Sequence, residues 1–274
     1  MKKFTLLLIA GVTMFGSAAL AAEGALPAKG INFSFEGPFG KFDRAELQRG
    51  YKVYKEVCAN CHAMHFVAFR NLSEKGGPGF SIEQVKALAA TFKVPSDPNT
   101  KGEIVDRDGL PSDRFPSPYP NPEAAIAANG AYPPDLSMIT KSREGWHGTF
   151  NQLWNGIGGP QYVYSVLTGY EKPSAEIEKE KPVGKYYNPY FQAGHWISMP
   201  PPLSEGQVKY DDKPKDYKAS VDEMARDVAA FLAWTAEPKM EERKQTGFSV
   251  LIYLAVLAGL LYLVKQKTWA KVEH

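Results

Sequence analysis

The sequence predicts a mainly α-helical domain with long proline-rich loops, followed by one C-terminal transmembrane helix. Three stretches carry apolar residues at helical spacing behind typical capping residues, and no run alternates as a strand would. Residues 247–264 contain no charged side chain. Seven of the 21 prolines fall within residues 95–122, which therefore form neither a helix nor a central strand. A loop this long inside one domain must be held in place by something other than a β-sheet.

The first 21 residues have the features of a secretory signal peptide. Lys2 and Lys3 precede a short apolar run, and residues 19–21 (Ala-Leu-Ala) match an A-x-A cleavage site. The run is short for a membrane span. We therefore expect an exported domain over residues 22–240.

Three helices are expected within this domain. The first begins behind a capping Asp, and the other two begin with capping boxes in which Ser is followed three residues later by Gln or Glu. Pro238 stops the third helix. The expected ranges are residues 43–59, 81–93 and 220–236.

The C-terminal span follows at residues 247–264, whose 18 residues just reach the length that crosses the hydrocarbon core. Three lysines lie in the tail, residues 265–274, which the positive-inside rule places in the cytoplasm. Without signal and tail, the exported part has two more acidic than basic residues. This balance excludes a typical nucleic-acid binder and is compatible with a basic protein partner.

The only two cysteines, Cys58 and Cys61, lie in the stretch VCANCH at the end of the first expected helix. A disulfide here would close a tiny loop and leave His62 unexplained. A zinc site wants four ligands, and the sequence contains no H-x₃₋₅-H pair. A haem-free thiol oxidoreductase would place C-x-x-C at the start of a helix in a βαβ unit. Here the motif lies at the end of an expected helix, and no βαβ pattern surrounds it.

C-x-x-C-H is the attachment signature of c-type haem. Cys58 and Cys61 would form thioethers with the haem vinyl groups, and His62 would be the proximal iron ligand. The sequence thus predicts one covalently bound haem c.

A second axial ligand on the opposite face has several candidates. Met199 precedes three prolines, which stiffen the segment that would present its sulfur. Met138 is expected to pack instead, and His147 and His195 are outside possibilities. Methionine ligation would raise the reduction potential relative to a bis-histidine site.

Four segments in this order carry a resemblance to a known family. They are CANCH, NGAYPPDLSMI at 129–139, YVYSVLTGY at 162–170, and NPYF with ISMPPPL within 188–203. The chain resembles the cytochrome c1 family, the haem subunit of the bacterial ubiquinol–cytochrome c reductase (bc1) complex.

The resemblance implies a class I-like cytochrome c haem domain with enlarged loops, in which the first and third helices pack together. It implies Met199 as the distal iron ligand, and Pro133 and Pro134 as part of the haem wall. Members often carry an arginine near a haem propionate where this chain has residues 155–159 (NGIGG). Arg114 and Arg143 are therefore only candidates for that role.

The family's role implies that the chain receives electrons from a Rieske iron–sulfur protein and passes them to a soluble or anchored cytochrome c. Cytochrome b would be its neighbour in the bacterial inner membrane, with the haem domain in the periplasm. It would then be an electron-transfer subunit of ubiquinol–cytochrome c oxidoreductase with no independent catalytic site. The alternatives are an anchored c-type carrier outside any complex, a haem subunit of a terminal oxidase, or the thiol oxidoreductase above.

Overall fold

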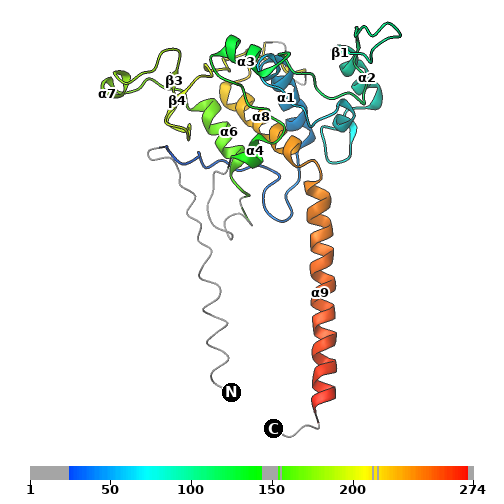
Figure 1. Cartoon of the computed structure of the whole chain (residues 1–274). Coiled ribbons are helices and arrows are strands. Elements are labelled where there is room, and N and C mark those ends of the chain that lie inside the picture. The colour runs from blue at the N-terminus through cyan, green and yellow to red at the C-terminus, as the bar shows by residue number, and fades with distance from the viewer. Residues whose placement is uncertain (1–24, 144–153, 155, 212, 215, 271–274) are drawn as a thin grey trace.

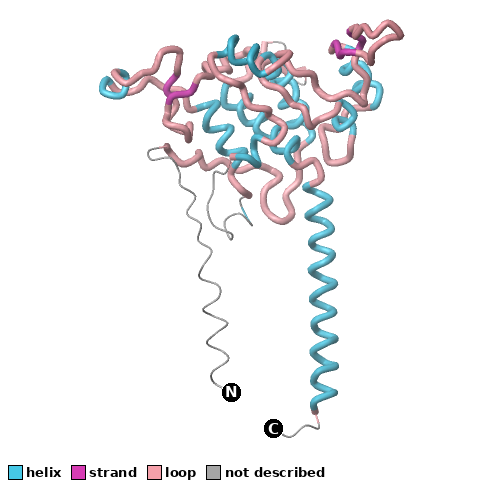
Figure 2. The backbone as a smooth tube through the Cα atoms, viewed as in Figure 1, coloured by secondary structure: helices cyan, strands magenta, loops and turns pink. Residues whose placement is uncertain are grey.

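A computed structural model describes residues 25–143, 154, 156–211, 213–214 and 216–270, so the expected signal peptide lies outside the described residues. The described chain forms a helical head from which one long helix projects (Figures 1 and 2). This confirms the mainly α fold class with a C-terminal apolar helix. The helices are α1 (Arg44–Glu56), α2 (Ile82–Ala90), α3 (Pro122–Asn129), α4 (Ile139–Ser142), α6 (Gly159–Thr168), α7 (Ala175–Glu178), α8 (Val221–Ala236) and α9 (Met240–Trp269).

The three expected helices are α1, α2 and α8, and their caps form as predicted. The Asp43 side chain accepts hydrogen bonds from the first free amides of α1. Ser81 and Ser220 each complete a capping box. The predicted C-terminal ends of α1 and α2 each run three residues too far, because each helix gives way to turns there.

The centre of the head is the packing of α1 against α8, as the resemblance implied. Tyr51 and Tyr54 of α1 each place their ring 5.8 Å from that of Phe231 on α8. Gly50 lets the two backbones touch, because a Cβ there would lie 2.0 Å from the Asp227 carbonyl oxygen. Almost every residue of α8 from Met224 onward is buried.

Helix α6 packs on α8 and α4, although the sequence predicted mostly loop between α2 and α8. It starts at Gly159, after Gly158 at φ 78°, and has no side-chain cap. A Cβ at Gly159 would lie 1.6 Å from the Thr140 carbonyl oxygen. The helix therefore exists through tertiary contact rather than through local signals.

Within the described part of the chain, two short antiparallel hairpins lie at the outer ends of the head (Figure 2). They pair β1 (Lys93–Pro95) with β2 (Asp106–Asp108), and β3 (Tyr186–Tyr187) with β4 (Trp196–Ile197). Strands of two or three residues are too short to show an alternating pattern, so no sequence pattern predicts them.

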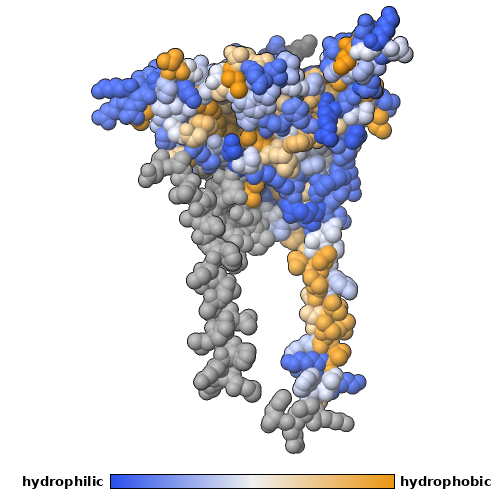
Figure 3. All heavy atoms as spheres, in the orientation of Figure 1, coloured by the Kyte–Doolittle hydropathy of each residue, from blue (hydrophilic) through white to orange (hydrophobic). Residues whose placement is uncertain are grey.

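Helix α9 spans 30 residues, and its most apolar 18-residue window has a mean hydropathy of 2.3 with no part buried. It is long and apolar enough to cross a membrane. Figure 3 shows a mostly apolar surface along this helix, with hydrophilic residues at its lower end. The expected span, residues 247–264, lies inside this helix.

Candidate functional site

The VCANCH stretch folds into a tight turn directly after α1. Cys58–Asn60 form a 3₁₀ turn, and the amides of Cys61 and His62 both donate to the Cys58 carbonyl, at 3.1 and 2.9 Å. The side-chain Nδ2 of Asn60 donates to the carbonyls of Glu56 and Val57 and so caps the end of α1. Two thiols and an imidazole are thereby gathered within five residues of backbone that α1 anchors to the core.

Both thiols are unpaired and half-buried, and Cys58 packs against the main core. Burial, with the neighbouring Cys61 as a second cause, raises the pKa of the Cys58 thiol to about 12. A redox-active C-x-x-C needs a thiol pKa lowered below the usual range. The raised pKa of Cys58 therefore counts against the thiol oxidoreductase alternative.

The His62 ring is held in one tautomer. Its Nδ1 lies 2.8 Å from the Pro134 carbonyl oxygen, which can only accept, so Nδ1 carries the proton and Nε2 keeps its lone pair. Burial lowers the pKa of His62 and favours the neutral ring. A neutral imidazole whose far nitrogen is fixed by a carbonyl is the usual form of a histidine metal ligand.

The segment after Pro134 is bonded along its length to the segment after His62. Leu136 donates its amide to the Ala63 carbonyl at 2.9 Å. The Asp135 carboxylate accepts from the His65 amide at 2.8 Å and pairs with its ring at 2.7 Å. Burial acts to raise the pKa of Asp135, but hydrogen bonds from His65 and Ser137 hold that pKa below its usual range.

Met199 lies in the loop after β4, away from the core that contacts Cys58. It packs against a second apolar cluster formed by Tyr162, Val166 and Ile197. The Tyr170 hydroxyl donates to the Met199 carbonyl at 3.0 Å. Helix α6 connects the two groups, because Tyr162 and Val166 belong to the second cluster while the intervening Tyr164 belongs to the main core.

The remaining candidates for the distal ligand differ in setting. The expectation that Met138 packs is wrong, since it precedes α4 with 41% of its surface exposed. His195 adopts a left-handed φ of 65°, and its buried Nδ1 has no hydrogen-bond partner among the described residues. His147 lies outside the described residues.

The two arginine candidates are both exposed. Arg114 donates to the His65 carbonyl at 2.8 Å, which places it beside the segment that follows His62. Arg143 bonds the hydroxyl of Tyr162 in the second cluster, which acts to lower that tyrosine's pKa against the larger effect of burial. Each therefore has a structural partner of its own.

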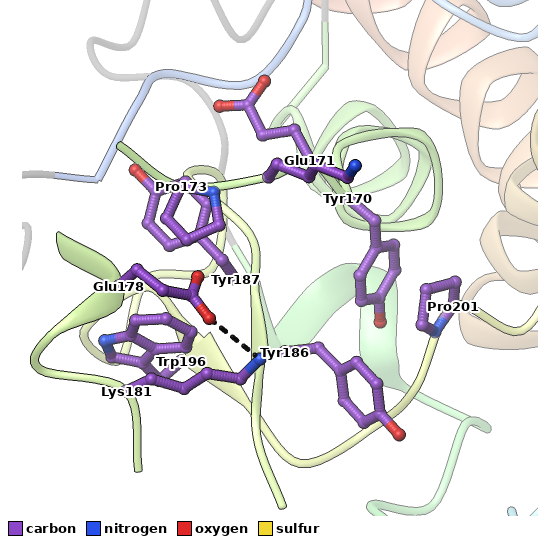
Figure 4. Close-up of a pocket in the computed structure, with 10 residues that line it drawn as sticks. Tyr170, Glu171, Pro173, Glu178, Lys181, Tyr186, Tyr187, Trp196 and Pro201 are labelled. Atoms are coloured by element: carbon purple, nitrogen blue, oxygen red, sulfur yellow. Dashed lines mark hydrogen bonds and ion pairs between the residues drawn. The ribbon is translucent and has the colours of Figure 1, made fainter. Parts of the chain in front are cut away.

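A cavity of about 600 Å³ lies between Tyr170 and the β3–β4 hairpin, next to the loop that contains Met199 (Figure 4). Tyr170 and Pro201 face each other on one side, and the Glu178–Lys181 pair, 3.3 Å apart, lies on the other. None of its lining residues comes from the VCANCH turn. Through Tyr170 and Pro201 the cavity borders the loop that presents Met199.

The residues present fit a covalently attached haem. They supply two free thiols at the attachment spacing and a neutral imidazole of fixed tautomer. The sequence could not reveal that Pro134 orients His62 or that Tyr170 holds Met199. These partners lie 72 and 29 positions apart, and nothing in a local pattern marks them.

Comparison with known proteins places similar chains in one family. The model of the Cytochrome C1 family matches residues 33–272. The chain is 46% identical to cytochrome c1 of Cereibacter sphaeroides, with 99% of this chain and 97% of that protein covered. It is 41% identical to cytochrome c1 of Rhodospirillum rubrum, with 98% and 97% covered.

A longer relative matches as well. The chain is 50% identical to cytochrome b/c1 of Bradyrhizobium diazoefficiens, with 96% of this chain covered. This chain covers only 39% of the length of that relative.

Proposed function

The chain belongs to the cytochrome c1 family, and on that premise we propose that it passes single electrons from a Rieske iron–sulfur protein to a cytochrome c. Members of this family are membrane-anchored electron carriers with covalently bound c-type haem, and they are subunits of the bc1 complex. The observation that carries the assignment to this site is the His62–Pro134 hydrogen bond beside two free thiols.

Four side chains would hold the haem. Cys58 and Cys61 would bind its edge covalently, His62 would ligate the iron through Nε2, and Met199 would ligate it from the other face. When bound, the haem supplies reversible one-electron oxidation and reduction. The protein's own part is to fix the His62 ring through the Pro134 carbonyl and the Met199 backbone through Tyr170.

Pro133 and Pro134 are proposed as part of the haem wall. Pro134 already borders the proximal ligand through its carbonyl, and Pro133 precedes it in the same stiff segment. The amides and side chains of residues 135–137 bond this segment to residues 63–66. The wall would therefore keep its place whether or not a partner protein is docked.

The proposed arrangement places the haem domain, residues 22–240, in the periplasm of a bacterium after removal of residues 1–21. Residues 247–264 would cross the inner membrane, beside cytochrome b, and residues 265–274 would lie in the cytoplasm. Support comes from the charge asymmetry around the span and from the apolar surface of α9. We assign no substrate-transforming site to this chain alone.

Purification in mild detergent, followed by spectra and gels, tests the proposal. We expect haem to stay with the chain on a denaturing gel, and a b-type cytochrome and an iron–sulfur protein to co-purify. Absence of both partners would contradict the complex and favour an isolated anchored carrier. Co-purification with a terminal oxidase would favour the other alternative, and loss of haem on the gel would contradict covalent attachment.

The slight acidic excess of the exported part predicts salt-sensitive reduction of a basic acceptor. We expect the rate of electron transfer to a basic soluble cytochrome c to fall as ionic strength rises, because screening removes the steering attraction. An acidic cytochrome c serves as the control and should show the opposite or no trend. Rates that do not respond to salt would contradict electrostatic docking.

A further inference from the structure

Four phenylalanines lie within residues 33–42 (FSFEGPFGKF), and one differs from the others. Phe33, Phe35 and Phe42 are buried, with successive ring centroids 5.1 and 4.8 Å apart. Phe39 has 74% of its surface exposed. The loop therefore fills the core with three rings and presents the fourth outside the head.

The backbone around Phe39 is a built turn. Gly37 adopts φ 69°, in the left-handed region that favours glycine. A Cβ at Gly40 would lie 2.0 Å from the Glu36 carbonyl oxygen, so the turn admits only glycine there. The Lys41 amide closes the loop onto the Ser34 carbonyl at 3.1 Å. Phe39 is thus exposed by a defined conformation.

This loop is bonded to the first turns of α9. The Lys244 ammonium donates to the carbonyls of Phe35 and Gly40, at 2.6 and 3.2 Å. The Phe42 amide donates to the Glu241 carboxylate at 3.0 Å. In Figure 1 the loop before α1 descends beside the start of α9.

Phe39 lies level with the beginning of the apolar span. Its ring contacts that of Phe248 edge to face, with centroids 5.7 Å apart. Phe248 is the second residue of the uncharged run that begins at residue 247. Aromatic rings are favoured at the depth where a span meets the lipid headgroups.

We propose that residues 37–41 form a second membrane contact, in which the Phe39 ring enters the lipid interface beside α9. The occupant of this surface is lipid, because the exposed ring continues the unburied apolar surface of the span itself. Lys41 is exposed next to it and supplies a cation that suits phosphate headgroups. The loop and the helix would then contact the bilayer as one unit.

Spin labelling of the full-length chain in phospholipid vesicles tests this contact. For a nitroxide on Phe39→Cys we measure the ratio of its collision rate with dissolved oxygen to its collision rate with a water-soluble nickel chelate. This ratio should be several-fold higher than the ratio at a control position. The matched control is Val183→Cys, fully exposed between α7 and β3 at the far end of the head (Figure 1). Equal access of the nickel chelate at both positions would overturn the proposal, and exclusion of both quenchers at position 39 would show a protein cover and also overturn it.

The labelling itself keeps this inference separate from the proposed function. Cys58 and Cys61 are blocked as thioethers if that function is right, so the unmutated chain should take up no label. Label on the unmutated chain would count against the haem attachment only. Phe39→Trp tests the same contact without a thiol. The fluorescence that this tryptophan adds to that of the unmutated chain should be quenched by brominated lipid. If the added fluorescence is not quenched, the proposed membrane contact is overturned.

Discussion

One hydroxyl group fixes the backbone that would present the distal ligand. Tyr170 follows Gly169 at the end of α6, where a Cβ on the glycine would lie 2.4 Å from the Tyr190 ring. Burial raises the pKa of Tyr170 far above its usual value, so its hydroxyl remains a donor to the Met199 carbonyl. The prolines after Met199 have no amide hydrogen, so this segment relies on its carbonyls for anchoring.

Tyr170→Phe should therefore loosen methionine ligation without removing the ring. A hydrogen bond of this kind contributes about 1 kcal/mol net, so the ligated form should weaken about fivefold. The near-infrared charge-transfer band of the ferric protein and binding of carbon monoxide to the ferrous protein measure the change.

Two further variants make that result interpretable. Tyr186→Phe, in the same cavity but more exposed, should leave both signals unchanged. Met199→Leu should abolish the methionine band, lower the potential and admit carbon monoxide. If Met199→Leu changes nothing, the ligand is His195 or Met138. If only Tyr170→Phe changes nothing, Met199 ligates without this support.

Glu46 couples stability to pH. Its side chain is buried near Asp227. Burial first, and the negative charge of Asp227 second, raise the pKa of Glu46 from 4.5 to about 7. Arg226, 3.8 Å away, and Arg49 act in the opposite direction. The folded chain thus keeps a proton that the unfolded chain releases above about pH 4.5. The free energy of unfolding should fall as pH rises from about 4.5 to about 7 and level off above.

Glu46→Gln should reduce this slope and stabilise the chain at pH 8. Some slope should remain, because burial also raises the pKa of Asp227, which Arg49 holds through two 2.9 Å bonds. Thermal unfolding of the haem-loaded protein across this range measures it. Glu56→Gln, exposed on the same helix, is the control and should keep the original slope. An unaltered slope in Glu46→Gln would contradict the assignment.

At the scale of elements, the α1–α8 contact depends on a glycine. Gly50→Ala would push a methyl group into the Asp227 backbone and the Phe231 side chain. Forcing extra volume into a packed core typically costs about 1–3 kcal/mol. We expect a lower free energy of unfolding in denaturant titration, together with weaker retention of the native haem spectrum, because α1 carries the attachment turn. Gly30→Ala, which meets open space, should unfold like the unmutated chain.

The elements also show what local sequence can and cannot predict. α1, α2 and α8 were predictable because each has a cap and an apolar face within its own residues. Helix α6 and the two hairpins were not, since α6 forms by fitting Gly159 against Thr140, and strands this short carry no period. The same division holds in the site, where the contiguous Cys58–His62 motif was visible and the long-range partners were not.

At the scale of the whole molecule, α9 is the principal anchor. A chain that ends at residue 246 keeps the bonds of Glu241 and Lys244 to the head and loses the apolar span. We expect it in the soluble periplasmic fraction with haem still attached, because one interfacial ring binds membranes far more weakly than a spanning helix. Fractionation and haem staining measure this, with the full chain in membranes as control. Retention of the shortened chain in washed membranes would show that other contacts suffice.

The bonds between head and helix also limit how the head can move relative to α9. Lys244 and Glu241 form hydrogen bonds with the loop before α1. Glu237 forms ion pairs with Lys141, at 3.5 Å, and with Arg243. These bonds resist rotation at Pro238, so the head keeps a set orientation relative to α9. A haem bound in this head would then stay at one place relative to the proposed span. On the proposed function, electron partners would then have to come to the haem, because this head cannot swing toward them.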